Sequence, residues 1–319
     1  MATSGTTTFS VNELDIYKDA LQNLGILGSG ETPSADDNAL CRHKLNLLVK
    51  QWVAQIDFAP GLKMWTRRRA YVFLQDGQIE YDLPGDKATE SYVTTTLTAA
   101  SAISDSTLTV DSITGIADED VIGIELDDGT LQWTTVSGTP SGSTVTITTA
   151  TTGAAAAGNR VFAYTTALAR QPFEIVSASL RSHDDDDVSD APMDPNLSVH
   201  EYELIPNKAG IGQPWQIYYE PKRTATTLYL NCAPADVTQV VRLVYLSKIE
   251  DLTANTGDID LPQEWYRPLT AQLAIDIAPA FQAKVTPELK LLRDESLKMA
   301  QHAYPEKSIA YFQSEPDDY

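Results

Sequence analysis

The chain has 319 residues and a net charge of −21, from 23 Lys and Arg against 44 Asp and Glu. Its 42% hydrophobic content is enough for a core, which argues against overall disorder, and the acidic excess argues against gripping nucleic acid or an anionic membrane over a broad basic face. Because no apolar run is long enough to span a membrane and the N-terminal residues lack the features of a secretory signal, we expect neither.

The N-terminal part of the chain predicts two helices followed by a β-hairpin. Ser10-Val11-Asn12-Glu13 has the spacing of a capping box that starts a helix, and Gly25 is placed to end it. A second helix is expected over residues 34–57, because apolar residues recur there at helical spacing. Strands are expected over residues 70–74 and 79–83, and the Asp-Gly turn between them predicts that they pair as a hairpin.

Residues 89–166 differ in composition from the rest of the chain. This stretch holds 20 Thr, 8 Ser and a single basic residue, Arg160. β-Branched residues alternate there with turn residues, which predicts six short strands over residues 93–98, 107–110, 121–126, 130–136, 144–148 and 161–164. The alternating apolar residues favour a folded module over the alternative, a low-complexity Thr-rich linker. We therefore expect a small all-β barrel or sandwich inserted into a second fold.

After the insert, the sequence predicts strands and then helices. The strands are expected over residues 173–180, 200–205, 215–220, 227–231 and 240–246, with an acidic loop after the first of them. One helix is expected after Pro262, because apolar residues recur every fourth position from Trp265 to Ile277. Thr286-Pro287 opens a last helix to about residue 303, with Met299 on its buried side.

These elements predict an α+β fold with a helical core and a β-rich region. Residues 1–88 and 167–303 form the discontinuous core in this interpretation, residues 89–166 the inserted all-β module, and residues 304–319 a flexible C-terminal tail.

No catalytic or cofactor-binding pattern is found in the sequence. It contains no phosphate-binding glycine loop, no G-x-S-x-G nucleophile elbow and no H-E-x-x-H zinc motif. Cys41 and Cys232 lie far apart and predict two free structural thiols, not a disulfide or a metal site. We therefore expect no enzyme, no cofactor and no metal.

The most concentrated charge is the acidic run Asp184, Asp185, Asp186 and Asp187. Such a run is typical of a solvated, self-repelling loop. A calcium site is a second interpretation, because hard cations take clustered carboxylates, but the EF-hand spacing is missing. The third is a wall that faces DNA without holding it, since carboxylates within a Debye length of about 8 Å repel a polyanion at physiological salt.

Two further features suggest contacts with other chains. The only basic triplet, Arg67, Arg68 and Arg69, indicates either charged strand edges that discourage edge pairing or contacts with an acidic neighbouring subunit. The tail carries aromatic residues at Tyr311, Phe312 and Tyr319. It is either a frayed terminus or a segment that docks into a partner on assembly, because aromatic side chains give large contact areas.

Several segments occur in an order that resembles a known family. They are the N-terminal helix pair with Leu45 and Trp52, Tyr81-Asp82-Leu83-Pro84, Glu201-Tyr202-Glu203-Leu204-Ile205-Pro206 with Gly212-Gln213-Pro214 and Leu228-Tyr229-Leu230, and Ile259-Asp260-Leu261-Pro262-Gln263-Glu264-Trp265 with Leu269 and Leu273-Ala274. Their order is similar to that of the head-to-tail adaptor proteins of short-tailed bacteriophages, also called packaged-DNA stabilisation or head completion proteins. The resemblance covers most of residues 10–88 and 168–303, and the Thr-rich module splits the usual join between Gly85 and Gln171.

The resemblance implies a structural virion protein of the head–tail neck, assembled in the bacterial host cytoplasm. It implies a homo-oligomeric ring, a dodecamer, beneath the portal protein, with an axial DNA channel and no enzymatic turnover. The tail of each subunit would reach the portal. Tail nozzle or tail fibre proteins would be further partners, with transient, non-specific contact with packaged DNA and none with membranes. The alternative is a virion-associated glycan-binding or glycan-degrading tail protein, whose module would stack a sugar ring on Trp133 and Tyr164.

Overall fold

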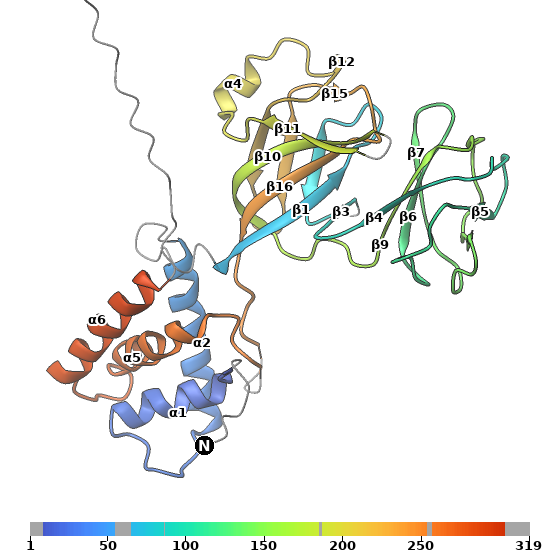
Figure 1. Cartoon of the computed structure of the whole chain (residues 1–319). Helices are drawn as coiled ribbons and strands as arrows, with labels where there is room; N and C mark the ends of the chain where they lie inside the picture. Colours follow the sequence, from blue (N-terminus) through green and yellow to red (C-terminus); the bar gives the residue numbers. More distant parts are fainter. Residues whose placement is uncertain (1–8, 55–64, 86, 185–186, 254–256, 304–319) are drawn as a thin grey trace, which may run out of the picture. The chain divides into compact units, whose positions relative to one another are not determined.

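The computed structural model describes residues 9–54, 65–85, 87–184, 187–253 and 257–303. They combine helices with mainly antiparallel sheets (Figure 1), which confirms the mixed α+β class. The chain divides into two compact units, Met1–Thr66 with Lys248–Tyr319, here called the helical unit, and Arg67–Ser247, here called the β unit. The strands before and after residues 89–166 therefore belong to the same compact unit as that stretch, the β unit. Among the described residues, no helix is both long and apolar enough to cross a bilayer.

The helical unit is built from the two ends of the chain. It contains α1 (Glu13–Asn23), α2 (Ala35–Ala54), the 3-10 turn η1 (Gln263–Trp265), α5 (Tyr266–Ile277) and α6 (Pro287–His302). The cap of α1 is Asn12, whose side chain accepts a hydrogen bond from the backbone N–H of Asp15 at 2.9 Å, so the capping box predicted from Ser10 is wrong. Gly25 follows the helix with a left-handed φ of +69°, as its predicted role in ending the helix requires. Residues 55–57, the expected end of the second helix, lie outside the described residues.

The helices share one apolar core. Trp52 of α2 meets Trp265 edge-on, with ring centroids 5.5 Å apart. The predicted stripe of α5 continues from Trp265 through Leu269, Leu273 and Ile277, all of which are buried. Helical spacing therefore identified this face correctly.

The buried face of α6 differs from the prediction at one position. Leu289 is buried as expected, but Met299 is 74% exposed, and Leu297 and Ala300 are buried instead. At about 100° per residue, position 299 is turned roughly 80° from the face of Leu289, whereas position 300 returns to within roughly 20° of it. The predicted burial of Met299 is wrong for this reason.

Two polar contacts fasten the helical unit. The Asn46 side chain donates to the backbone carbonyl of Leu252 at 3.0 Å and accepts from its N–H at 2.9 Å, which ties the segment after the β unit to α2. The Tyr17 hydroxyl donates to the Glu13 carboxylate at 2.9 Å, and both side chains are buried. Burial and this bond raise the pKa of Tyr17.

Outside the inserted stretch, the β unit is made of two main sheets that face each other across one core. The five-stranded sheet has the order β11-β10-β16-β1-β3, and the three-stranded sheet the order β13-β14-β2. The strands and the short helix of this part are β1 (Arg67–Phe73), β2 (Glu80–Leu83), β3 (Ala88–Thr89), β10 (Pro172–Asp184), β11 (Asp187–Met193), α4 (Val199–Glu203), β12 (Ile211–Gly212), β13 (Ile217–Pro221), β14 (Thr226–Leu230), β15 (Ala233–Pro234) and β16 (Val240–Ser247). The short strands β12 and β15 pair with each other in parallel.

The predicted hairpin of β1 and β2 does not form. β1 pairs with β16 and β3, and β2 pairs with β14 in the other sheet. Val72 of β1 and Leu74 just after it, and Tyr81 and Leu83 of β2, are all buried in the core between the sheets. Placing the strands in opposed sheets lets both apolar faces pack against each other, which pairing side by side would not achieve.

Two further segments differ from their predicted structure. Residues 200–205, expected as a strand, form most of α4, because Ser198 and Glu201 build a reciprocal capping box at its start. The expected acidic loop after residue 180 is largely regular structure: β10 extends to Asp184 and pairs with β11 as an antiparallel hairpin.

The stretch 89–166 contains all six predicted strands. They are β4 (Val93–Thr96), β5 (Thr107–Thr109), β6 (Val121–Glu125), β7 (Leu131–Thr135), β8 (Thr144–Thr146) and β9 (Arg160–Tyr164). Four form a sheet of order β4-β9-β6-β7, and β5 pairs with β8. β6 and β7 pair as a hairpin, and Gly129 in the Asp128-Gly129 turn between them takes a left-handed φ of +81°. The stretch has an apolar core of its own, so it is folded and not a linker.

Candidate interaction surfaces

The predicted basic triplet, Arg67, Arg68 and Arg69, lies at the start of β1 and pairs in register with the end of β16. Side chains alternate along a strand, so Arg67 and Arg69 share one side of the sheet and Arg68 takes the other. With Glu90 and Val244 they line an open hollow of about 570 Å³. The three arginines therefore lie on a strand that is paired with its neighbour, and the Arg69 side chain is exposed. Its contact with a neighbouring subunit stays a prediction.

A second charged cluster crosses three strands of the same sheet. Arg181 of β10 binds the carboxylate of Asp190 through two hydrogen bonds of 2.8 and 2.9 Å, and Arg242 of β16 adds a third at 2.9 Å. The hydrogen bond from Arg181 is the main cause that lowers the pKa of Asp190, and the same bond raises that of Arg181. The Arg181 guanidinium also lies over the Tyr71 ring, 5.5 Å from its centroid. These hydrogen-bonded ion pairs connect β10, β11 and β16.

The acidic run falls at the turn between β10 and β11. Asp184 ends one strand and Asp187 begins the other, while Asp185 and Asp186 lie outside the described residues. At the base of the turn His183 is buried, and its Nε2 lies 2.7 Å from the Tyr92 hydroxyl. A role in facing DNA stays a prediction.

Five aromatic side chains join the inserted module to the five-stranded sheet, here called the module joint: Phe73, Tyr92, Trp133, Phe162 and Tyr164. The Tyr164 ring stacks on Phe73 at 5.6 Å and 10°, and only 2% of Tyr164 is exposed. Trp133 lies 4.9 Å from the same Phe73 ring. The predicted sugar platform of Trp133 and Tyr164 is therefore wrong, because these rings are taken up in holding the module to the sheet.

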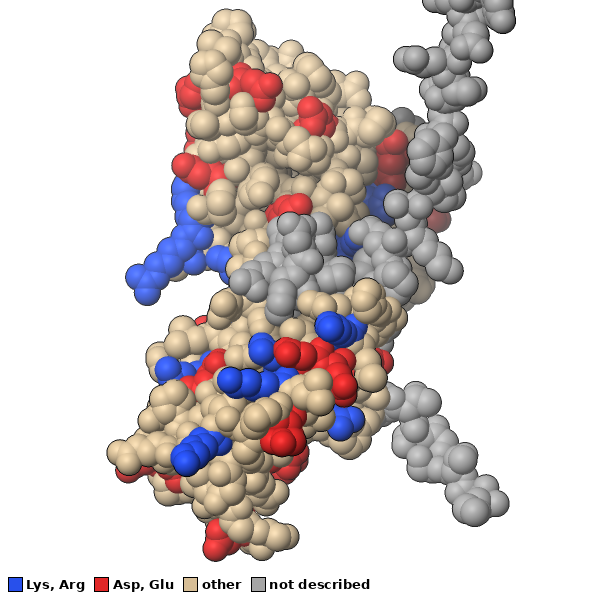
Figure 2. All heavy atoms as spheres, turned by 90° about the vertical axis from the view of Figure 1, so that its left-hand side faces the viewer, with Lys and Arg blue, Asp and Glu red and all other residues tan. Residues whose placement is uncertain are grey.

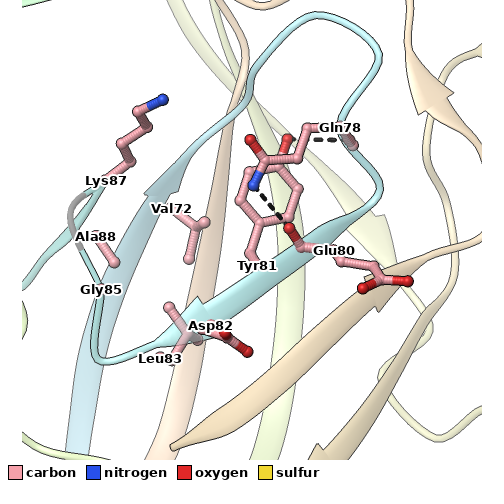
Figure 3. A pocket seen from close by; sticks show the side chains of 9 residues that line it. All are labelled: Val72, Gln78, Glu80, Tyr81, Asp82, Leu83, Gly85, Lys87 and Ala88. Atoms are coloured by element: carbon pink, nitrogen blue, oxygen red, sulfur yellow. Dashed lines mark hydrogen bonds between the residues drawn. The ribbon is translucent and has the colours of Figure 1, made fainter.

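A hollow of about 340 Å³ opens beside β2, where the two sheets diverge (Figure 3). The Tyr81 hydroxyl at its wall accepts from the Gln75 N–H at 2.9 Å and donates to the Gln78 carbonyl at 3.1 Å. Burial raises the pKa of Tyr81 to about 12. Lys87 and Glu80 point to opposite sides of the hollow in Figure 3. Tyr81 thus fixes the turn before β2 and stays protonated at neutral pH.

Three adjoining hollows run over the helical unit and are here called the helical groove. Their volumes are about 780, 370 and 320 Å³. The first two share Phe9 and Tyr266, and the second and third share Arg267 and Leu292. Phe9 and Met299 in this groove are exposed. Adjoining hollows that expose apolar side chains among charged ones, on a unit with an apolar core of its own, are typical of a protein interface.

The remaining predicted residues have no described site. Tyr311, Phe312 and Tyr319 lie in the C-terminal segment 304–319, outside the described residues. Cys41 is buried and Cys232 half-buried, both as free thiols, and burial raises the pKa of Cys41 to about 11. In the described part of the chain, no three His, Cys, Asp or Glu side chains are grouped so that they could hold a metal ion.

Comparisons with known proteins give few matches. No family model matches the sequence, and no curated protein matches it significantly. Among solved structures, VP17, a capsid protein of bacteriophage P23-77, aligns with 60% of this chain and 76% of its own at 11% identity. The TM-score of this alignment is 0.12, which is too low for a shared fold.

Proposed function

We propose that the chain is a structural subunit of a bacteriophage virion that assembles into a head-to-tail adaptor ring, joining the portal to the tail and forming part of the DNA channel. The order of sequence segments that resembles this family supports the proposal. The observation that carries it is the helical groove, three adjoining hollows of mixed apolar and polar lining on a unit that has an apolar core of its own.

The helical groove suits a contact between neighbouring subunits. Phe9, Trp65 and Met299 offer exposed apolar surface. The charged residues of the lining are Arg267 and the carboxylates of Asp19, Asp258, Asp260, Glu264 and Glu295. Apolar centres with a few charged groups are the usual composition of stable interfaces. In this proposal each subunit seats part of its neighbour's helical unit there, and residues 304–319, which follow α6, reach the portal.

The charge of the chain fits passage of a genome through the ring. At −21 per subunit, a ring of such chains repels the phosphate backbone and lets duplex DNA slide without sticking. The acidic run Asp184 to Asp187, whose first residue ends β10 and whose last begins β11, is proposed to face the channel. Arg67 to Arg69 would then offset repulsion at the seams between subunits. The proposal requires no catalysis, cofactor or membrane.

The test is the mass of the assembled particle. The purified full chain is mixed with the portal protein of the same phage at several salt concentrations and weighed by mass photometry. We expect a closed ring of like subunits, a dodecamer, bound to the portal. A chain that stays monomeric and unbound at every salt concentration contradicts the proposal.

A matched pair of variants locates the contact. Phe9→Ser with Met299→Ser removes exposed apolar surface from the helical groove and should weaken ring formation. Ile103→Ser removes a similarly exposed apolar side chain from the inserted module and should leave the ring intact. Equal effects from both variants would show that the helical groove is not the seam.

A further inference from the structure

Three tyrosine rings form a cluster on the β unit, here called the tyrosine platform: Tyr202 of α4, which is buried, and Tyr218 of β13 and Tyr229 of β14, which are partly buried. Tyr218 stacks on Tyr202 and on Tyr229, with ring centroids 5.5 Å apart in both pairs. Strand register places Tyr218 directly beside Tyr229. The alternate residues of these strands, such as Leu228, are buried in the core between the sheets. The platform is therefore on the outer face of the three-stranded sheet.

Carboxylates surround the tyrosine platform. In the register of the sheet, Glu80 lies beside Tyr229, and in the next row Glu220, Thr227 and Asp82 lie side by side. Burial and, after it, the charge of Glu80 raise the pKa of Tyr202 to about 12. This places negative potential over rings whose faces are themselves negative. The site therefore favours a cation.

Two lysines of the chain lie at the tyrosine platform. Lys222 is 3.6 Å from the Glu220 carboxylate and donates to the Thr227 hydroxyl at 2.7 Å, and Lys208 covers part of Tyr202. The Lys208 ammonium lies 4.7 Å from the centroid of the Tyr202 ring and 3.6 Å from the Glu203 carboxylate. This is the geometry in which a ring face and a carboxylate hold a positive charge together. Tyr218 and Tyr229, next to it, are only partly buried and offer the same chemistry to a group from outside.

The chain around the tyrosine platform also exposes apolar side chains. Among the described residues, four of the twelve large apolar side chains that are strongly exposed fall between positions 199 and 215: Val199, Leu204, Ile211 and Trp215. Such a concentration marks a surface that another protein covers. In Figure 2 the side of the β unit that carries α4 faces the viewer and shows Asp and Glu scattered over a mostly uncharged surface, with Lys and Arg toward its lower edges.

We propose that the tyrosine platform, together with the exposed apolar side chains of the segment 199–215 that carries Tyr202, is the docking site of a partner protein that presents Arg or Lys among apolar residues. The exposed apolar area and tyrosines fit a protein, and the carboxylates select its positive charge. A second copy of this chain would bring another −21, and nucleic acid would bring phosphates, so charge disfavours both. The inference goes beyond the adaptor proposal, because it concerns a surface that a single chain carries.

The test uses two labelled seven-residue peptides that alternate leucine with arginine or with its neutral analogue citrulline. Their binding to the full chain is measured by fluorescence anisotropy in 150 mM salt. We expect the arginine peptide to bind roughly tenfold more tightly than the citrulline peptide. Tyr218→Leu and Tyr229→Leu should each weaken it roughly 2- to 30-fold, and Tyr218→Phe, which keeps the ring, should bind like the parent chain.

Charge variants separate this site from general attraction to an acidic protein. Glu80→Gln with Glu220→Gln should weaken the arginine peptide, while Asp111→Asn with Glu119→Gln, which removes two exposed carboxylates of the inserted module, should not. Thermal melting confirms that each variant is folded. The proposal would be overturned if both peptides bound equally well, or if both charge variants weakened binding by the same factor. It would also be overturned if the leucine variants bound like the parent chain, or if chitohexaose bound more tightly than the arginine peptide.

Discussion

Removal of the Phe73 ring should release the inserted module from the five-stranded sheet. The ring is fully buried and lies 4.9–5.6 Å, between centroids, from four other rings of the module joint. Burying a Phe side chain contributes about 1.5–3 kcal/mol, and the cavity left by truncation brings the cost of Phe→Ala to about 3–5 kcal/mol. Rigid aromatic neighbours cannot collapse into the gap, so we expect about 4 kcal/mol for Phe73→Ala, a large part of a typical domain's stability.

The measurement is urea unfolding followed by circular dichroism, combined with limited proteolysis. Phe73→Ala should lower the free energy of unfolding by about 4 kcal/mol and expose the segments on both sides of the module to cleavage. The matched control is Phe173→Ala, which truncates a half-buried ring of β10 and should cost less than about 1.5 kcal/mol. A loss below about 1 kcal/mol for Phe73→Ala, with the cleavage pattern of the parent chain, would refute the role of the module joint.

Three further changes test separate parts of the fold. Gly123→Ala places a Cβ 2.8 Å from the Trp133 ring, so overpacking should lower the melting temperature by the equivalent of about 1–3 kcal/mol; an unchanged melting temperature would contradict the placement of that ring. Asn46→Ala removes both side-chain bonds to Leu252 and should cost about 1–3 kcal/mol in urea unfolding, whereas no loss would mean that water replaces them. The contacts with arginine lower the pKa of Asp190, so they stabilise the fold above the ordinary pKa of an aspartate, and this stability is lost as the pH falls through the lowered pKa. Asp190→Asn should therefore make the free energy of unfolding depend less on pH in the acidic range. An unchanged pH dependence would count against the arginine contacts.

Local patterns predicted many elements, and long-range pairing explains most of the errors. The Thr-rich stretch alternates apolar and polar residues, and each of its six strands is found, as is the apolar stripe from Trp265 to Ile277. The β1–β2 hairpin fails because an Asp-Gly turn specifies a reversal of the chain but not which strand will pair. α4 was missed because its aromatic residues suggested a strand, although Ser198 and Glu201 had the capping-box spacing.

Surfaces were harder to predict than elements. Trp133 and Tyr164 lie in strands that the sequence predicted. Their rings pack against Phe73, which precedes them in the chain by 60 or more residues, and no local pattern reveals such a contact. The tyrosine platform was missed for the same reason, because Tyr218 and Tyr229 become neighbours only in the register of β13 and β14. The acidic run and the basic triplet are visible in the sequence, but their partners are not.

The order in which the ribosome makes the chain has a consequence for the helical unit. Its first two helices are complete at Ala54, but the helices that cover them begin only at Tyr266. At about 5–20 residues per second, synthesis of the intervening segment takes roughly 10–40 s. During that interval the nascent α1–α2 pair displays uncovered Trp52 and Leu45, and the β unit cannot complete its five-stranded sheet until β16 is made. A chaperone that binds the emerging polypeptide would therefore find a target at the N-terminal helices.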